Sequence, residues 1–274
     1  MKSWIGGVAA LTALFGGSVG LLVLTGSQET GNRPDGTSGV EVSTHDAVEV
    51  TVPPHPRSGS SPPPLRRPEV PECTNDEERA EGDPLADWAT IVVDTGHQLD
   101  PAYVPPDLVS VAEAGFYDNG DTIRRVVLAD LGALRAAAEA HGTPIMIVSA
   151  FRDAAYQRNL FEGRVVTNGP EEAAAYTARP GHSEHQLGTA IDVLDPQGRE
   201  LNANFGLTPT GVWVEAHAHE FGFVLSYPEG ARDTTCYDYE PWHLRYVGRD
   251  IAGRIHRSGM TPRDWLLSQA MAAG

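Results

Sequence analysis

The pattern of apolar and polar positions divides the chain into three parts, of which the first is a long apolar run. Residues 4–24 read WIGGVAALTALFGGSVGLLVL without a charge, and a helix of this length covers about 30 Å, enough to span a bilayer. The Thr25-Gly26-Ser27 exit is a weak cleavage site, so we expect residues 1–26 to be an uncleaved membrane anchor, with a cleaved secretory signal as the alternative. On either interpretation the rest of the chain is exported.

Residues 27–72 form the second part, which is rich in Gly, Ser, Thr and Pro and has almost no aromatic or periodic apolar positions. Such a composition buries too little apolar surface to offset the entropy lost on ordering. We interpret the segment as a disordered tether, stiffened locally by prolines at 53–56 and 62–64, that holds a domain away from the membrane. The prolines could instead bind a proline-recognising partner.

Residues 73–274 form the third part, in which short apolar runs alternate with turn signals. Apolar positions at helical spacing predict an amphipathic helix over 122–141, with a polar cap within 118–121 and a stop at Gly142. Further helices are expected over 153–162 and 211–220, and a loop over 165–181. Strands are expected over 144–148, 188–194 and 243–247, and the segment 87–93 ends in a β-branched run. Helices and strands mix without regular βαβ repetition, so the predicted fold class is α+β.

The charge and the cysteine content exclude several classes of ligand and site. The formal net charge is −17, from 20 basic and 37 acidic residues, which argues against nucleic acid as a ligand. Cys73 and Cys236 are too few for a disulfide scaffold or a four-cysteine zinc site. Because the domain is exported and no third cysteine competes, we expect them to form one disulfide, with Cys236 as a zinc ligand the alternative.

The densest group of polar residues that could carry chemistry is His-Ser-Glu-His at 182–185, followed by Asp192 and His243. Hydrolytic zinc sites use imidazole and carboxylate groups as three protein ligands and leave one position open. His185, Asp192 and His243 would supply such a set, and a bare carboxylate in the apolar run around Asp192 needs a cation. Alternatively, Asp192 pairs with an arginine such as Arg245 and His185 caps a loop.

Two further residues could serve catalysis. Glu240 precedes His243 by three positions, but Pro241 between them makes a helical H-E-x-x-H arrangement unsuitable. A loop could still place Glu240 beside a metal site, or the residue could be a surface glutamate next to an aromatic strand. Arg152 ends a predicted strand, and its planar guanidinium suits a carboxylate or a developing oxyanion, although a surface ion pair is equally compatible.

His217 and His219 are the other histidine pair that suggests a chelate. Residues two apart on a helix point about 200° away from each other, so they cannot share one metal ion. We therefore expect no metal-binding role for this pair.

Four segments contain most of these residues: SAFR at 149–152, RPGHSEHQLGTAID at 179–192, FGFVLSYP at 221–228 and YEPWHLRYVG at 239–248. Together they resemble the VanY-type D-alanyl-D-alanine carboxypeptidases, which are zinc peptidases of the bacterial cell wall. The central motif S-x-H-x-x-G-x-A-x-D is present without departure from Ser183 to Asp192. The resemblance covers the chain from about Trp88 to the C-terminal helix, and it implies a small antiparallel sheet that carries a zinc site and is flanked by helices.

The resemblance also implies roles for individual residues. The implied ligands of one zinc ion per chain are His185, Asp192 and His243. Glu240 would be the general base that passes a proton to the leaving amine, and Arg152 would contact the substrate and stabilise charge at the scissile carbonyl. Gln157 and Ser183 match positions near the bound peptide terminus.

The implied reaction is the trimming of peptidoglycan stem peptides or their precursors, by attack of a water that zinc activates. L,D-carboxypeptidases and wall endopeptidases of the same fold share these motifs and are the alternative. A catalytically silent wall-binding module is a further alternative, against which an intact Glu240 argues. We expect a monomer that works outside the cytoplasm, held to the cell membrane by its N-terminal segment.

Overall fold

The computed structural model describes residues 77–198 and 200–273. The proposed anchor at 1–26, the proposed tether at 27–72 and Cys73 lie outside the described residues. Within the described part, no helix has both the length and the apolar character needed to cross a membrane. Cys236 is disulfide-bonded, and its pairing with Cys73 stays a prediction.

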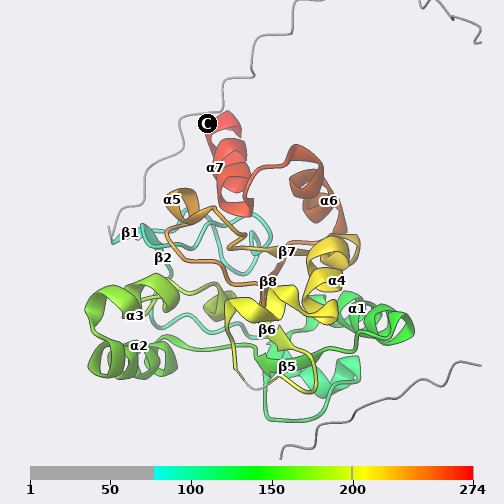
Figure 1. The fold of residues 1–274 in the computed structure, drawn as a ribbon. Helices are drawn as coiled ribbons and strands as arrows, with labels where there is room; N and C mark the ends of the chain where they lie inside the picture. The colour runs from blue at the N-terminus through cyan, green and yellow to red at the C-terminus, as the bar shows by residue number, and fades with distance from the viewer. Residues whose placement is uncertain (1–76, 199, 274) are drawn as a thin grey trace, which may run out of the picture. The chain divides into compact units, whose positions relative to one another are not determined.

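A four-stranded antiparallel sheet lies at the centre of the fold, in the order β5-β6-β8-β7 (Figure 1). Its strands are β5 (Met146–Ser149), β6 (Ala190–Leu194), β8 (His243–Tyr246) and β7 (Phe223–Leu225). Every residue of the central strands β6 and β8 is buried. The three strands expected over 144–148, 188–194 and 243–247 are confirmed to within two residues at each end, and the mixed architecture confirms the α+β class.

The strand register brings together residues that lie far apart in the sequence. Asp192 on β6 lies opposite His243 on β8. Ser149 on β5 lies opposite Asp192 from the other side, after an irregularity in the pairing near Ile147. Directly opposed residues in an antiparallel pair place their side chains on the same face within about 5.5 Å, so the sheet concentrates these polar groups at one place.

Helices cover the flanks of the sheet (Figure 1). They are α1 (Leu128–His141), α2 (Ala154–Asn168), α3 (Pro170–Tyr176), α4 (Pro209–His217), α5 (Arg232–Thr235), α6 (Arg249–Ser258) and α7 (Pro262–Ala273). The helices α2 and α3 form a hairpin on one flank, whereas α1 and α4 lie together on the other. The largest hydrophobic cluster joins α1 and α4 to the sheet and contains Leu131, Leu134, Ile191, Val193, Val214 and Leu244.

Smaller elements precede and connect these. They are the parallel pair β1 (Glu78–Arg79) and β2 (His97–Gln98), the antiparallel pair β3 (Leu108–Ser110) and β4 (Thr122–Arg124), and the 3-10 turns η1 (Val111–Ala114), η2 (Arg125–Val127), η3 (Glu184–Leu187), η4 (Ala203–Leu207) and η5 (Ala218–Phe221). The β-branched run of 87–93 is not a strand. Its Ile91 and Val93 are buried in irregular backbone, where they pack against Leu99.

The helix expected over 122–141 begins six residues later than predicted. Residues 122–124 form strand β4 instead, because their backbone pairs with β3 and buries Ile123. Asp121, one of the expected caps, accepts a hydrogen bond from the backbone of Ala150 at 3.2 Å. The predicted stop at Gly142 is confirmed, with a left-handed φ of 81° that closes the helix.

The loop expected over 165–181 was wrong for most of its length. The helix α2 continues to Asn168, and α3 follows after the single residue Gly169. Gly169 has a φ of 87°, which a residue with a side chain rarely adopts, and Pro170 suits the first turn of α3. The expected helix over 211–220 is confirmed as α4, which passes directly into η5.

Asp94 joins three segments that lie far apart in the sequence and is 4% exposed. Its Oδ1 accepts hydrogen bonds from the backbone and the Nδ1 of His97, both at 2.8 Å. Its Oδ2 accepts from Arg263 Nε of α7 at 2.6 Å, and its carbonyl oxygen lies 2.7 Å from His182 Nδ1. Although burial opposes it, the contacts with His97 and Arg263 hold the pKa of Asp94 well below its usual range.

Replacement of Asp94 by alanine should lower the free energy of unfolding by about 3–5 kcal/mol at pH 7, because it removes the buried counter-charge of Arg263. A depressed carboxyl pKa contributes stability above the unfolded value, so the difference between wild type and Asp94→Ala should shrink as the pH falls below about 4. Urea unfolding of the wild type and Asp94→Ala, at pH 7 and below about pH 4, measures this difference in the free energy of unfolding. A loss below 1 kcal/mol at pH 7 would contradict this account.

Candidate metal centre

Three elements position the predicted metal ligands. His185 lies in the 3-10 turn η3, and Ser183 is the N-cap of this turn, since its hydroxyl accepts a hydrogen bond from the backbone of His185 at 3.4 Å. Asp192 is the middle residue of β6 and His243 the first residue of β8. Between η3 and β6, Gly188 turns the chain with a φ of 70°, and a Cβ there would lie 2.9 Å from the side chain of Arg124. The spacing inside the motif thus follows from a turn that leads into a buried strand.

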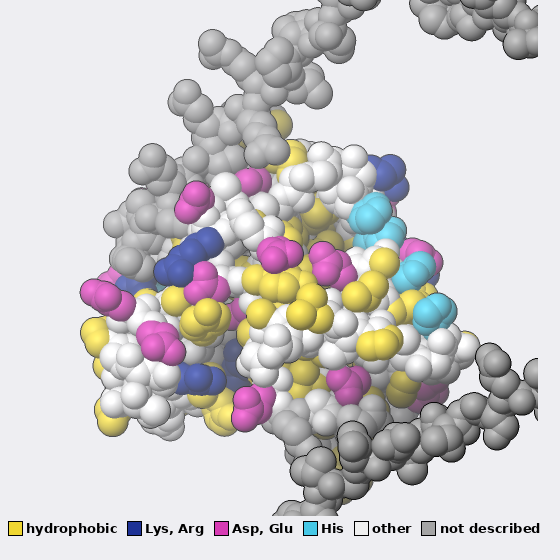
Figure 2. All heavy atoms as spheres, in the orientation of Figure 1, with side chains coloured by type: hydrophobic (Ala, Val, Ile, Leu, Met, Phe, Trp, Pro, Cys, Tyr) yellow, Lys and Arg dark blue, Asp and Glu magenta, His cyan; other side chains and the backbone are white. Residues whose placement is uncertain are grey.

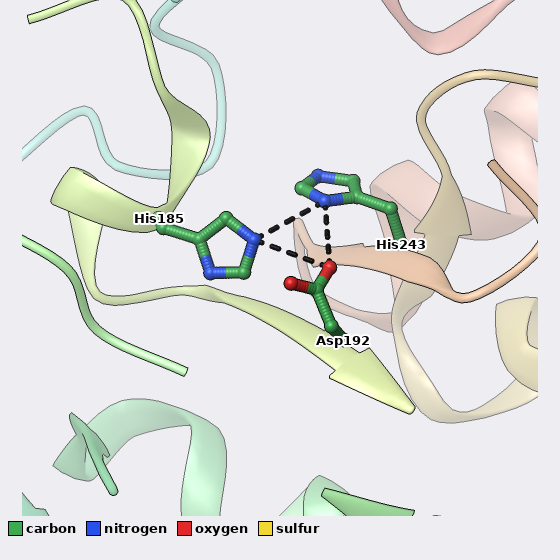
Figure 3. A group of neighbouring side chains, drawn as sticks. All are labelled: His185, Asp192 and His243. Atoms are coloured by element: carbon green, nitrogen blue, oxygen red, sulfur yellow. Dashed lines mark hydrogen bonds and ion pairs between the residues drawn. The ribbon is translucent and has the colours of Figure 1, made fainter. Parts of the chain in front are cut away.

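The three candidate ligand atoms form a nearly equilateral triangle (Figure 3). Asp192 Oδ1 lies 3.3 Å from His185 Nε2 and 3.2 Å from His243 Nδ1, and the two nitrogens are 3.3 Å apart. A tetrahedral zinc ion with bonds of 2.0–2.1 Å holds its ligand atoms about 3.3 Å apart. The residues present therefore fit a zinc ion in both donor type and spacing.

The ring nitrogens that face away from this triangle have acceptors of their own. His185 Nδ1 lies 2.6 Å from the carbonyl oxygen of Ala150, which leaves Nε2 to face the site. His243 Nε2 lies 2.9 Å from Glu184 Oε2, which leaves Nδ1 to face it. Sequence reasoning assigned no role to Glu184, because nothing in the spacing relates it to a histidine 59 positions later.

Burial and neighbouring charges set the protonation of the cluster. Burial and the charge of Arg152 lower the pKa of His185 to about 4. Burial works against the charged form of His243, but its hydrogen bonds with Asp192 and Glu184 raise its pKa to about 10. Burial likewise opposes ionisation of Asp192, yet His185, His243 and Arg152 hold its pKa well below the usual range. The metal-free site thus pairs an ionised carboxylate with one neutral and one protonated imidazole.

Arg152 makes contact with the candidate ligand Asp192. Its Nη1 donates to Asp192 Oδ2 at 2.9 Å and to Ser149 Oγ at 2.8 Å. Its Nε donates to Gln157 Oε1 at 3.1 Å. Within the described residues Nη2 has no hydrogen-bond partner, and Arg152 lines the same cleft as the metal cluster. One Asp192 oxygen therefore faces the metal position while the other orients the arginine.

The remaining predicted site residues, Gln157, Ser183 and Glu240, also line this cleft. Gln157 and Ser183 are nevertheless buried, and their side chains hold other parts of the site in place. Gln157 is 1% exposed and is held between Arg152 and the carbonyl oxygen of Ala178, to which it donates at 2.8 Å. Ser183 is buried and caps η3. Glu240 is buried in the turn before β8 and makes no side-chain hydrogen bond within the described part of the chain; burial raises its pKa to about 8.

The cleft has a volume of about 860 Å³ and is much larger than the cluster at its base. One wall is the α2–α3 hairpin, with Tyr156, Arg164, Glu172 and Tyr176, and the other is formed by residues 201–204 and 237–240. Acidic and basic side chains lie close together over this hairpin (Figure 2). The cleft thus leads from a mixed polar and aromatic surface to the buried charged cluster.

Arg245 and the other histidines of the described residues lie outside the ligand triangle. His217 contacts Glu220 at 2.8 Å, whereas His219 stacks on His256 with ring centroids 3.6 Å apart. The histidines visible in Figure 2 gather on the side of α4 and α6, away from the hairpin. Arg245 pairs with Glu184 at 2.9 Å, so the arginine partner of Asp192 is Arg152 instead.

Two buried imidazoles and one carboxylate at the base of an open cleft are characteristic of hydrolytic metal sites. Comparison with known proteins agrees with this class. Residues 120–249 match the family model VanY, described as D-alanyl-D-alanine carboxypeptidase. This part of the chain belongs to the VanY family.

Individual relatives match a longer part of the chain than the family model does. The putative carboxypeptidase YodJ of Bacillus subtilis is 36% identical over 178 residues, which are 64% of this chain and 65% of that protein. The LdcB LD-carboxypeptidase structure is 36% identical with a TM-score of 0.58, covering 64% of this chain and 83% of that one. The vancomycin resistance D,D-pentapeptidase VanY, an E175A mutant in complex with Zn(II), is 26% identical with a TM-score of 0.56, covering 65% and 99%.

Zinc binding should strengthen as the pH rises. Because the pKa of His243 is raised to about 10 in the metal-free protein, its ring carries a proton at pH 7 that must leave before Nδ1 can bind zinc. The apparent affinity should rise by about tenfold per pH unit between pH 6 and 8, with release of about one proton. Calorimetry in buffers of different ionisation enthalpy measures the proton count, and a pH-independent affinity would contradict the assignment.

Proposed function

We propose that this protein is a zinc-dependent D-alanyl-D-alanine carboxypeptidase that trims peptidoglycan stem peptides. The observation that carries the proposal is the ligand triangle, which fits zinc and shares one cleft with Glu240 and Arg152. The family match and the zinc complex of the related D,D-pentapeptidase support it. We further propose one zinc ion per chain, held by His185, Asp192 and His243.

The chain's own residues have separable tasks in this proposal. A bound zinc ion would supply Lewis acidity at the base of the cleft. Glu240, when ionised, accepts the proton of the attacking water and returns it to the leaving amine, for which a pKa raised by burial is suited. Arg152 offers Nη2, which has no partner among the described residues, to negative charge on the substrate or at the reacting carbonyl, while Ser149, Gln157 and Asp192 hold the guanidinium in place.

A second candidate activity is L,D-carboxypeptidase. It is favoured by the higher identity to the LdcB LD-carboxypeptidase, 36% against 26% for the D,D-pentapeptidase. Both kinds of enzyme break a peptide bond at a free C-terminus, so they can share the metal cluster and differ in the walls of the cleft. The α2–α3 hairpin and residues 201–204 are where such a difference would lie.

We propose that the enzyme acts outside the cytoplasm as a monomer, with residues 1–26 as membrane anchor and 27–72 as tether to a domain over 73–274. Support comes from the uncharged apolar run at 4–24 and the Gly, Ser and Pro content that follows it. Such an arrangement would let the domain sample wall peptides just outside the membrane. Fractionation of cells that express the full chain, before and after carbonate wash, tests the anchor against a cleaved signal.

Incubation with defined muropeptides should distinguish the two activities. A D,D-carboxypeptidase converts pentapeptide stems to tetrapeptides and leaves tetrapeptides intact, whereas an L,D-carboxypeptidase removes the last residue of tetrapeptides. We expect loss of one terminal D-alanine from the pentapeptide by mass spectrometry, abolished by a chelator and restored by zinc. Cleavage of the tetrapeptide alone would establish the L,D activity, and cleavage of neither would refute both.

Replacement of Glu240 by alanine should separate catalysis from metal binding. Because Glu240 lies outside the ligand triangle, zinc content should stay at the wild-type level while turnover falls by about 10²- to 10⁴-fold. His219→Ala is the control variant. It removes a side chain that stacks on His256 outside the ligand triangle, so zinc content and turnover should both stay unchanged. Near wild-type turnover in Glu240→Ala would show that another group is the base.

A further inference from the structure

Glu184 is the most connected buried carboxylate near the metal cluster, although the proposed reaction gives it no task. It is 6% exposed and lies in η3, directly before His185. Its Oε2 accepts from Ser226 Oγ at 2.6 Å and lies 2.9 Å from His243 Nε2. Its Oε1 accepts from Arg245 Nη1 at 2.9 Å. Two side chains from strand β8 and one from the loop after β7 therefore converge on one carboxylate.

The contact with His243 determines which ring nitrogen can bind a metal ion. A neutral imidazole has one protonated and one unprotonated nitrogen, and only the latter can be a ligand. In the neutral ring that binds a metal ion, the carboxylate at Nε2 favours the proton there, so the lone pair lies on Nδ1, which faces Asp192 and His185. The other ligand ring is oriented by a neutral group, the carbonyl of Ala150. The charged support is therefore specific to His243.

Arg245 keeps the carboxylate in place from the opposite side. It is 1% exposed and lies on β8, two residues after His243, so both side chains start from the same strand face. Its Nη2 donates to the carbonyl oxygens of Ile91 at 2.6 Å and Trp88 at 3.2 Å. These two carbonyls come from irregular backbone that precedes the residues matched by the family model.

We propose that Glu184 is a positioning residue that selects the Nδ1-binding form of His243, and that Arg245 ties this support to the backbone at 88–91. The proposal rests on the zinc site of the proposed function, but not on its substrate. It assigns a role in zinc affinity to residues 88–91, which precede the residues 120–249 that match the family model. Removing the support should weaken zinc binding even though all three ligands remain.

The test measures the zinc dissociation constant by competition with a chelating dye. Glu184→Ala should weaken zinc binding by about 10- to 100-fold, and Ser226→Ala, which removes one hydrogen bond to Glu184, should weaken it less. Asp94→Ala is the matched control, because it also removes a buried carboxylate paired with an arginine but has no contact with a ligand. It should lose thermal stability yet bind zinc within about twofold of the wild type.

A second measurement keeps the proposal testable if Glu184→Ala does not fold. Long-range ¹H–¹⁵N spectra of the zinc-loaded wild type should show His243 protonated at Nε2 and metal-bound at Nδ1. Coordination through Nε2 would overturn the proposal, as would wild-type zinc affinity in folded Glu184→Ala protein or an equal loss in Asp94→Ala. None of these readouts requires substrate cleavage, so a failed peptidase assay and a failed positioning role give different results.

Discussion

The pairing of β6 with β8 is the interaction on which the rest of the site depends. Its register sets Asp192 opposite His243 in the middle of the sheet, where both strands are fully buried. Because side chains alternate between the two faces of a strand, a slip of one residue would send one of the two to the other face. The hydrophobic cluster on the far side fixes this register through the residues next to the ligands, which are Ile191, Val193 and Leu244.

Burial of so many charged groups is stable only because nearly every carboxylate faces a cation. Asp192 faces Arg152, and Glu184 faces Arg245. Glu240 is the exception, since it makes no side-chain hydrogen bond within the described residues and burial raises its pKa to about 8. A divalent cation in the ligand triangle would complete the compensation, in the same place where the donor spacing fits zinc.

The two sides of the site have different kinds of support, and this difference bears on specificity. On the inner side, hydrogen bonds from buried groups hold the ligands and Arg152 rigidly. On the outer side, the cleft is lined by the α2–α3 hairpin, where Tyr156 and Tyr176 are largely exposed. The chain is similar in fold to structures of both L,D and D,D type, with TM-scores of 0.58 and 0.56, so the fold alone does not separate the two activities.

The sequence by itself indicated His185, Asp192 and His243 as candidate ligands, because donor type and spacing reflect local turns and strands that neighbouring residues encode, whereas the roles expected for Glu240 and Arg152 came from the family resemblance and not from spacing. Apolar periodicity, which is a local signal, also predicted three of the four strands of the central sheet and most of helices α1, α2 and α4. It failed at 122–124 and 165–176, where strand pairing with β3 and the break at Gly169 decide the structure. Only the tertiary structure showed that Gln157 supports Arg152 and that Glu184 contacts His243. Those contacts join residues from separate elements, and their partners are chosen by packing in three dimensions, which no spacing along the chain records.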